Sequence, residues 1–208
     1  MKWKFTPYDL DEWNKSSSRV LFVASEPNGD NPNGGIKDMG NWFRTAKDNG
    51  YHSNKLFHNR CRMILNGVLK SESESNFNNF RFMDLKATAG GARANKIEIA
   101  NYIKDNKQDV MQYFVSEDEN FGLRPHVTIL LGNLAYELFS RHLRTEVQKE
   151  NQELRWVQMP HPSAQTVHNE SLLEACGEIN NHLWPIDKAA DKWFCKGKKS
   201  NGWLRATP

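Results

Sequence analysis

Two loops of this sequence combine side chains that could carry out chemistry with prolines that stiffen the backbone beside them. In the first loop Glu26 precedes Pro27, and in the second His161 lies between Pro160 and Pro162. A carboxylate held rigidly can activate a water molecule or stabilise a developing cation, and a fixed imidazole can stabilise developing charge. Each residue also has a plainer explanation, Glu26 as the cap of a turn and His161 as a structural histidine.

A third candidate segment combines an acid with basic residues. Asp84 lies near the end of the apolar run 80–85, and Lys86 and Arg93 lie in the loop that follows it. An ionised carboxylate only accepts hydrogen bonds, so Asp84 would suit an amino group and repel a carbonyl oxygen. The alternative is that Asp84 forms an ion pair with Lys86 or Arg93.

These loops must be positioned by the apolar elements between them. Four runs rich in β-forming residues predict strands at 20–24, 80–85, 127–131 and 156–159. Apolar residues at three- and four-residue spacing predict helices at 54–69, 94–114, 133–143 and 170–183. The alternation predicts a three-layer α/β fold, with a four-stranded, mainly parallel sheet and helices on both faces. Ligands of such sheets bind outside the carboxyl ends of the strands, where the candidate loops lie.

Four segments in this order resemble the signature segments of the uracil-DNA glycosylase superfamily. They are Ala-Ser-Glu-Pro at 24–27, Phe-Met-Asp-Leu-Lys at 82–86, Leu-Gly-Asn-Leu-Ala at 131–135 and His-Pro-Ser at 161–163. Each motif is short, but four in the right order on the right kinds of element are more specific than any one of them. The resemblance covers roughly residues 19–184.

The resemblance implies an enzyme that flips a nucleotide into a pocket and cuts the bond between base and sugar, without metal or cofactor. Glu26 takes the position of the water-activating residue, and His161 matches the histidine that hydrogen-bonds the base O2 atom. Ser163 would contact a backbone phosphate, Gln165 would probe the duplex, and Lys86 lies in a loop that matches a lysine-containing loop of the family.

Three departures from the family pattern bear on the substrate. Glu26 is one methylene longer than the usual residue, and Asp84 replaces an asparagine that reads uracil. Asn28 replaces the tyrosine that closes the pocket at the C5 atom of the base, in a glycine-rich loop at 28–35. An acceptor for the cytosine amino group, with space at C5, favours a 5-substituted cytosine. Glucosylated hydroxymethylcytosine of phage DNA is such a base, which resembles the logic of a phage-defence branch of the superfamily.

Aromatic and basic residues outside these loops have two explanations each. Trp42 or Phe43 would stack on the base, or pack in the core. The tail 188–208 mixes aromatic residues with Lys196, Lys198 and Lys199, which would contact the DNA backbone or form an ordinary solvated surface. Arg93 is a further candidate DNA contact.

Composition indicates a soluble globular protein. The 208 residues are 38% hydrophobic and 25% charged, with a net charge of +3, which permits DNA binding without requiring it. The length predicts a single domain at 1–208. We expect a cytoplasmic monomer without membrane association, since no apolar run is long enough to span a bilayer and no signal peptide is recognisable. The three cysteines lack metal-ligand spacing.

The leading hypothesis is therefore a monofunctional DNA glycosylase that excises a 5-substituted cytosine in antiviral defence. The alternatives are a uracil-DNA glycosylase of base-excision repair, a non-catalytic nucleic-acid-binding protein on the same fold, and an unrelated nucleotide-binding α/β domain.

Overall fold

A computed structural model describes residues 10–15, 19–26, 60–61, 64–65, 80–88, 94–117 and 123–161. Several predictions made from the sequence lie outside these residues: those on Asn28, Trp42, Phe43, Arg93, Ser163, Gln165, Lys196, Lys198 and Lys199, and the helix at 170–183.

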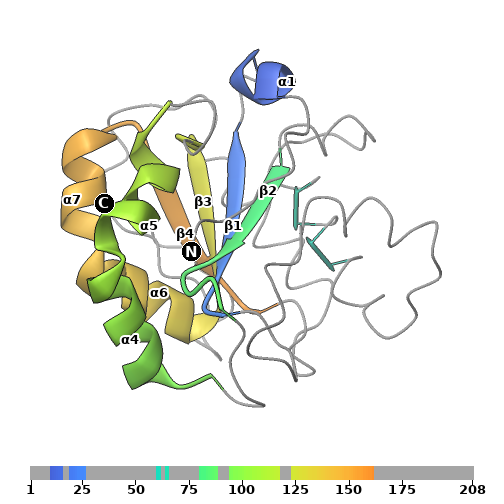
Figure 1. Cartoon of the computed structure of the whole chain (residues 1–208). Coiled ribbons are helices and arrows are strands. Elements are labelled where there is room, and N and C mark those ends of the chain that lie inside the picture. The colour runs from blue at the N-terminus through green and yellow to red at the C-terminus, as the bar shows by residue number, and fades with distance from the viewer. Residues whose placement is uncertain are drawn as a thin grey trace.

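The centre of the fold is a sheet of four parallel strands, which confirms the predicted parallel sheet (Figure 1). The strands are β1 (Val20–Ala24), β2 (Phe80–Asp84), β3 (Val127–Leu131) and β4 (Arg155–Met159). Their order across the sheet is β2-β1-β3-β4, and each neighbouring pair is parallel. All four strands lie where the apolar runs predicted them, because strands buried on both faces are rich in apolar side chains.

Five helices are described in full. They are α1 (Leu10–Lys15), α4 (Lys96–Asp105), α5 (Lys107–Val115), α6 (Gly132–His142) and α7 (Arg144–Glu150). Helix α6 confirms the helix predicted at 133–143. Sequence periodicity did not predict α1 or α7, since each is too short to show a repeating apolar pattern.

The single helix predicted at 94–114 is wrong, because Asn106 divides it into α4 and α5. Asn106 has φ −119° and ψ 25°, outside the helical region. Its backbone N–H and its side-chain Nδ2 both donate to the carbonyl oxygen of Tyr102, at 3.0 and 2.9 Å. Asparagine side chains compete for backbone acceptors in this way, which interrupts a helix without any change in apolar spacing.

The core on one face of the sheet joins the strands to the helices. Leu21, Val23 and Met83 pack in one apolar cluster with buried residues of α4, α5, α6 and α7. Within it, the ring of Phe139 lies 5.3 Å from that of Phe114 and 5.7 Å from that of Trp156, in tilted arrangements that aromatic rings prefer.

The opposite face of the sheet is also buried. Phe22 and Phe82, which alternate with the residues of the first cluster, are nearly inaccessible to solvent, as are Cys61, Ile64 and Leu65 of a helical segment. None of these five belongs to the first cluster. Burial on both faces agrees with a three-layer α/β arrangement.

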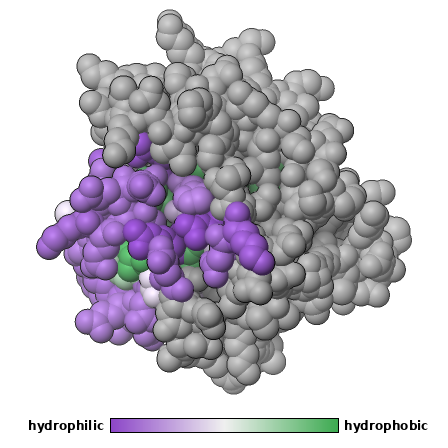
Figure 2. Space-filling model, turned by 90° about the horizontal axis from the view of Figure 1, so that it is seen from above, coloured by the Kyte–Doolittle hydropathy of each residue, from purple (hydrophilic) through white to green (hydrophobic). Residues whose placement is uncertain are grey.

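The described surface is mainly polar. Seen from above, its residues are largely hydrophilic with small apolar areas (Figure 2). Ile97 is the one large hydrophobic side chain that is exposed among the described residues. In the same part of the chain, no helix is both long and apolar enough to cross a membrane.

Candidate active site

The parallel sheet brings the candidate residues to one edge. Glu26 and Lys86 each lie two residues beyond the end of their strands, β1 and β2, and His161 lies two residues beyond β4. Ala24 and Asp84 are register partners. Since the strands are parallel, their carboxyl ends lie together at the edge where ligands bind in such sheets.

Backbone hydrogen bonds extend the pairing of β1 and β2 past the strand ends. The Leu85 N–H donates to the Ala24 carbonyl at 2.9 Å, and the Lys86 N–H donates to the Ser25 carbonyl at 3.0 Å. These bonds hold the two loops in register, so that Glu26 and Lys86 are neighbours through the backbone as well as through their side chains.

Glu26 and Lys86 form a buried ion pair. The Lys86 Nζ donates to the Glu26 Oε2 at 3.1 Å, and the two side chains are only 4% and 3% exposed. The second carboxylate oxygen, Glu26 Oε1, is buried, and no described residue donates a hydrogen bond to it. A buried charged oxygen without a donor costs folding free energy, so this atom is a candidate to bind a water molecule or a ligand.

Lys86 also binds Glu98, which lies in the first turn of α4 and is 57% exposed. Burial alone would lower the pKa of Lys86, but hydrogen bonds to Glu98 and Glu26, together with their charges, raise the pKa above its ordinary value. Lys86 is therefore an ammonium ion at neutral pH. Asp84 is not one of its partners, so the alternative prediction of an Asp84–Lys86 ion pair is wrong. The other partner considered for Asp84, Arg93, lies outside the described residues.

Asp84 is a buried acid at the end of β2, and it is 3% exposed. Burial, and then the negative charge of Glu26, raise the pKa of Asp84 to about 8. The carboxyl group is therefore protonated at neutral pH, whereas the sequence analysis considered an ionised form. A protonated carboxyl has one hydroxyl donor and one carbonyl acceptor, so its recognition properties resemble those of an amide.

His161 lies partly buried beside the start of α6. Gly132 begins this helix with φ +86°, and a Cβ atom at Gly132 would lie 3.6 Å from the Cβ atom of His161. Burial lowers the pKa of His161, so its imidazole is neutral at pH 7 and can donate one hydrogen bond. Next to Gly132, Asn133 accepts a hydrogen bond from Gln158 of β4, which joins the start of α6 to the edge strand.

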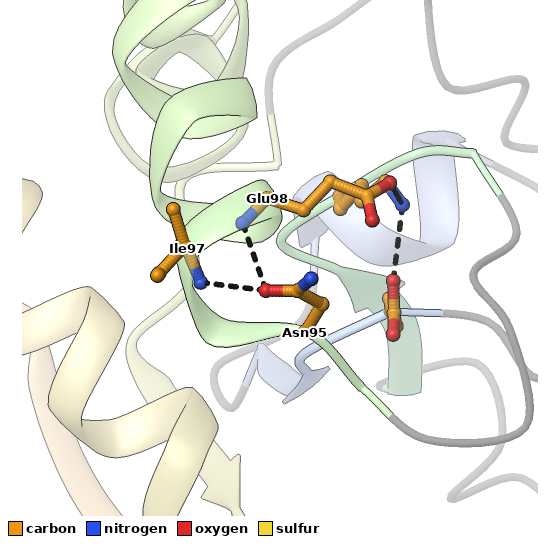
Figure 3. Close-up of polar contacts among 5 residues, drawn as sticks. Asn95, Ile97 and Glu98 are labelled. Carbon is orange, nitrogen blue, oxygen red and sulfur yellow. Dashed lines mark hydrogen bonds and ion pairs between the residues drawn. The ribbon is translucent and has the colours of Figure 1, made fainter.

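Glu98 is a site residue that the sequence analysis missed, although a signal was present. Asn95 caps α4, because its Oδ1 accepts from the N–H groups of Ile97 and Glu98 at 3.1 and 3.3 Å (Figure 3). Asparagine followed three residues later by glutamate is a helix-start pattern. Here the glutamate side chain extends away from α4 and binds Lys86.

Comparison with known proteins adds no assignment: no protein-family model matches the chain, and no curated protein matches it. Among the described residues, no group of three or more His, Cys, Asp and Glu side chains is arranged to hold a metal ion.

The strand ends carry three groups that could take part in catalysis. They are the buried Glu26 carboxylate, whose Oε1 has no donor among the described residues, the buried neutral acid of Asp84 and the neutral imidazole of His161. Each group has the chemistry for one part of a hydrolytic reaction: a carboxylate can activate water, and a neutral acid and a neutral imidazole can hydrogen-bond a planar heterocycle.

Proposed function

We propose that the chain is a monofunctional DNA glycosylase that flips out a 5-substituted cytosine and excises it, leaving an abasic site. Glucosylated hydroxymethylcytosine of phage DNA is the proposed substrate, and antiviral defence the proposed role. The observation that carries the proposal is the buried Glu26 carboxylate at the carboxyl end of β1, with Oε2 bound by Lys86 and Oε1 without a donor among the described residues.

In the proposed reaction, Glu26 Oε1 accepts a proton from a water molecule whose oxygen attacks C1′ of the sugar. The bond between base and sugar breaks, and its electron pair leaves with the base. Negative charge near the sugar stabilises an oxocarbenium-like transition state, and the neutral His161 would donate a hydrogen bond to the O2 atom of the departing base. The His161 contact rests on the family resemblance.

Lys86 supports the monofunctional part of the proposal. A glycosylase that also cleaves the DNA strand uses an amine with a free electron pair as its nucleophile. Lys86 is protonated and bound by two carboxylates, Glu26 and Glu98, so it is not available for this role. An intact abasic site is therefore the expected product.

Asp84 is proposed to read the base. As a neutral acid, its carbonyl oxygen can accept from the cytosine N4 amino group while its hydroxyl donates to N3. This pairing satisfies both groups without a proton on the cytosine ring. The preference for a 5-substituted base rests on the glycine-rich loop that begins at Asn28, which lies outside the described residues.

The raised pKa of Asp84 also supports a second candidate, an ordinary uracil-DNA glycosylase. With its donor and acceptor reversed, the same neutral acid can donate to the uracil O4 and accept from its N3–H. An ionised Asp84 would lose its hydroxyl donor, so it would repel the uracil O4 and equally the cytosine N3, while still accepting from the uracil N3–H or the cytosine amino group. Ionisation therefore weakens recognition of both bases, and the two candidates are separated by the base that is released fastest.

The test is competition between oligonucleotides that carry uracil, cytosine, hydroxymethylcytosine and glucosylated hydroxymethylcytosine, measured as abasic-site formation below and above the Asp84 pKa of about 8. The proposal predicts fastest release of a 5-substituted cytosine. It also predicts that release of either base falls as the pH rises through this value to roughly 9, because an ionised Asp84 no longer donates a hydrogen bond. Faster release of uracil at neutral pH would favour the second candidate. Binding without release from any DNA would favour a non-catalytic protein.

A further inference from the structure

The ion pair between Lys86 and Glu26 extends to a third residue on a different element. Glu26 follows β1, Lys86 follows β2, and Glu98 lies in the first turn of α4. The described contacts thus connect the proposed water-activating residue, through one buried ammonium group, to a carboxylate that is half exposed.

All three members are held by backbone structure. The register bonds beyond β1 and β2 hold the two loops, and the Asn95 cap fixes the first turn of α4. Each side chain therefore starts from a defined backbone position. Rigid support of this kind is what a catalytic group needs, because a displacement of about 1 Å can cost roughly a hundredfold in rate.

The contacts also determine the net charge of Glu26, Lys86 and Glu98 as a group. An isolated lysine would largely neutralise Glu26 and weaken its attraction for a developing cation. Here the ammonium group of Lys86 is shared between two carboxylates, so the three residues together carry one negative charge at neutral pH. Glu98 is thereby placed to limit how far Lys86 neutralises Glu26.

On the basis of the proposed function, we infer that Lys86 and Glu98 are positioning residues. Lys86 holds the Glu26 carboxylate through Oε2 so that Oε1 alone serves the attacking water, and Glu98 holds Lys86 and preserves the negative charge of the group.

Three other titratable groups could also shape the pH–rate profile. They come from β2, α4 and the loop after β4, and they are Asp84, Tyr102 and His161. Asp84 ionises only on the alkaline side, as does the hydroxyl of Tyr102, whose pKa burial raises. Because Lys86→Met and Glu98→Gln leave these three groups in place, a displacement of the acidic limb of the pH–rate profile between variants reports on the cluster.

The test is single-turnover base release from the preferred oligonucleotide across pH, for the full-length protein. Loss of a cation favours the protonated form of a neighbouring carboxylate, so Lys86→Met should move the acidic limb to higher pH by about one unit or more. At neutral pH it should slow release by roughly 10- to 100-fold. Lys86→Arg should retain most of the rate and the original limb.

Glu98→Gln should displace the acidic limb in the direction opposite to that expected for Lys86→Met. Without the competing carboxylate, Lys86 stabilises the Glu26 anion more strongly, so the acidic limb should move to lower pH. The shift should be smaller because Glu98 is exposed to screening solvent. Lys107→Met is the control, since Lys107 forms a more exposed ion pair with Glu146 that joins α5 to α7, and it should leave the profile unchanged.

A folded Lys86→Met variant with the wild-type acidic limb would overturn the inference. If that variant does not fold, an unmoved limb in Glu98→Gln, or a displaced limb in Lys86→Arg, would overturn it instead. Absence of base release by the unmodified protein contradicts the proposed function. If the unmodified protein releases the base but the acidic limbs of Lys86→Met and Glu98→Gln do not move, only the positioning role is contradicted.

Discussion

At the scale of single residues, Asp84 shows how a buried acid can reduce stability. A buried acid without an ion-pair partner among the described residues must stay protonated in the folded chain, while the unfolded chain ionises it freely. The fold therefore binds a proton that the unfolded state has released. Strongly shifted pKa values of this kind cluster at functional sites.

Asp84→Asn should therefore stabilise the fold at neutral pH. The folded pKa is about 8 and the unfolded value about 3.9, so between them the folded state binds more protons and stability falls as pH rises. The slope is at most about 1.4 kcal/mol per pH unit. Urea denaturation at several pH values should show that Asp84→Asn lacks this decline. The exposed Asp105→Asn is the control, and an unchanged decline in Asp84→Asn would refute the protonated state.

The proposed catalytic pair gives a second prediction at this scale. Glu26→Gln and His161→Ala should each slow base release by about 10²- to 10⁴-fold, typical of acid–base and electrostatic contributions. Both residues lie in loops beyond the strand ends, so the folded state and DNA binding should persist. Single-turnover release is the measurement, with His142→Ala on α6 as the matched control. Near wild-type rates in both variants would refute the site assignment.

At the scale of elements, the sequence predicted the sheet better than the helices. Val20–Ala24 is an unbroken apolar run, and the other three strands are mainly apolar runs that include polar residues such as Arg81, Thr128 and Gln158. Burial on both faces of a parallel sheet explains this composition. The break at Asn106 was not predictable from periodicity, because the apolar spacing continues through it while a side-chain hydrogen bond ends the helix.

The candidate site was predicted in part. Positions at or just beyond strand ends made Glu26, Asp84 and His161 candidates, and the parallel sheet places those strand ends at one edge. Contacts between different elements could not be predicted from the sequence. Lys86 was expected to bind Asp84 or DNA, and Glu98 was not considered, although the two carboxylates that Lys86 contacts are Glu26 and Glu98. The protonation state of Asp84 could not be decided from the sequence, since it depends on burial and on the charge of Glu26, which only the folded structure defines.

The junction between β3 and α6 yields a prediction about Gly132. Its φ of +86° is costly for residues with a Cβ atom, whereas an added methyl group would make ordinary van der Waals contact with His161. Gly132→Ala should therefore lose about 1–2 kcal/mol of stability through the backbone alone. Gly132→Asn should lose less, because asparagine tolerates positive φ better. Chemical denaturation of both variants measures the difference, and equal losses would contradict a backbone origin.

At the scale of the whole molecule, the modest net charge of +3 makes the distribution of lysines important for DNA binding. Replacing Lys196, Lys198 and Lys199 by glutamine should weaken DNA binding and reduce its salt dependence by about one unit of slope per lost phosphate contact. Binding titrations at several salt concentrations measure this slope. Lys104→Gln on α4 is the control, and an unchanged slope in the triple variant would leave the tail as ordinary surface.

The most direct test of the central proposal is release of the modified base itself. Purified protein is incubated with duplex DNA containing glucosylated hydroxymethylcytosine, and mass spectrometry detects both the free base and the abasic strand. We predict that the unmodified protein produces both in equal amounts without strand cleavage, and that Glu26→Gln produces neither at a comparable rate. The absence of free base from this DNA and from uracil-containing DNA would contradict the account.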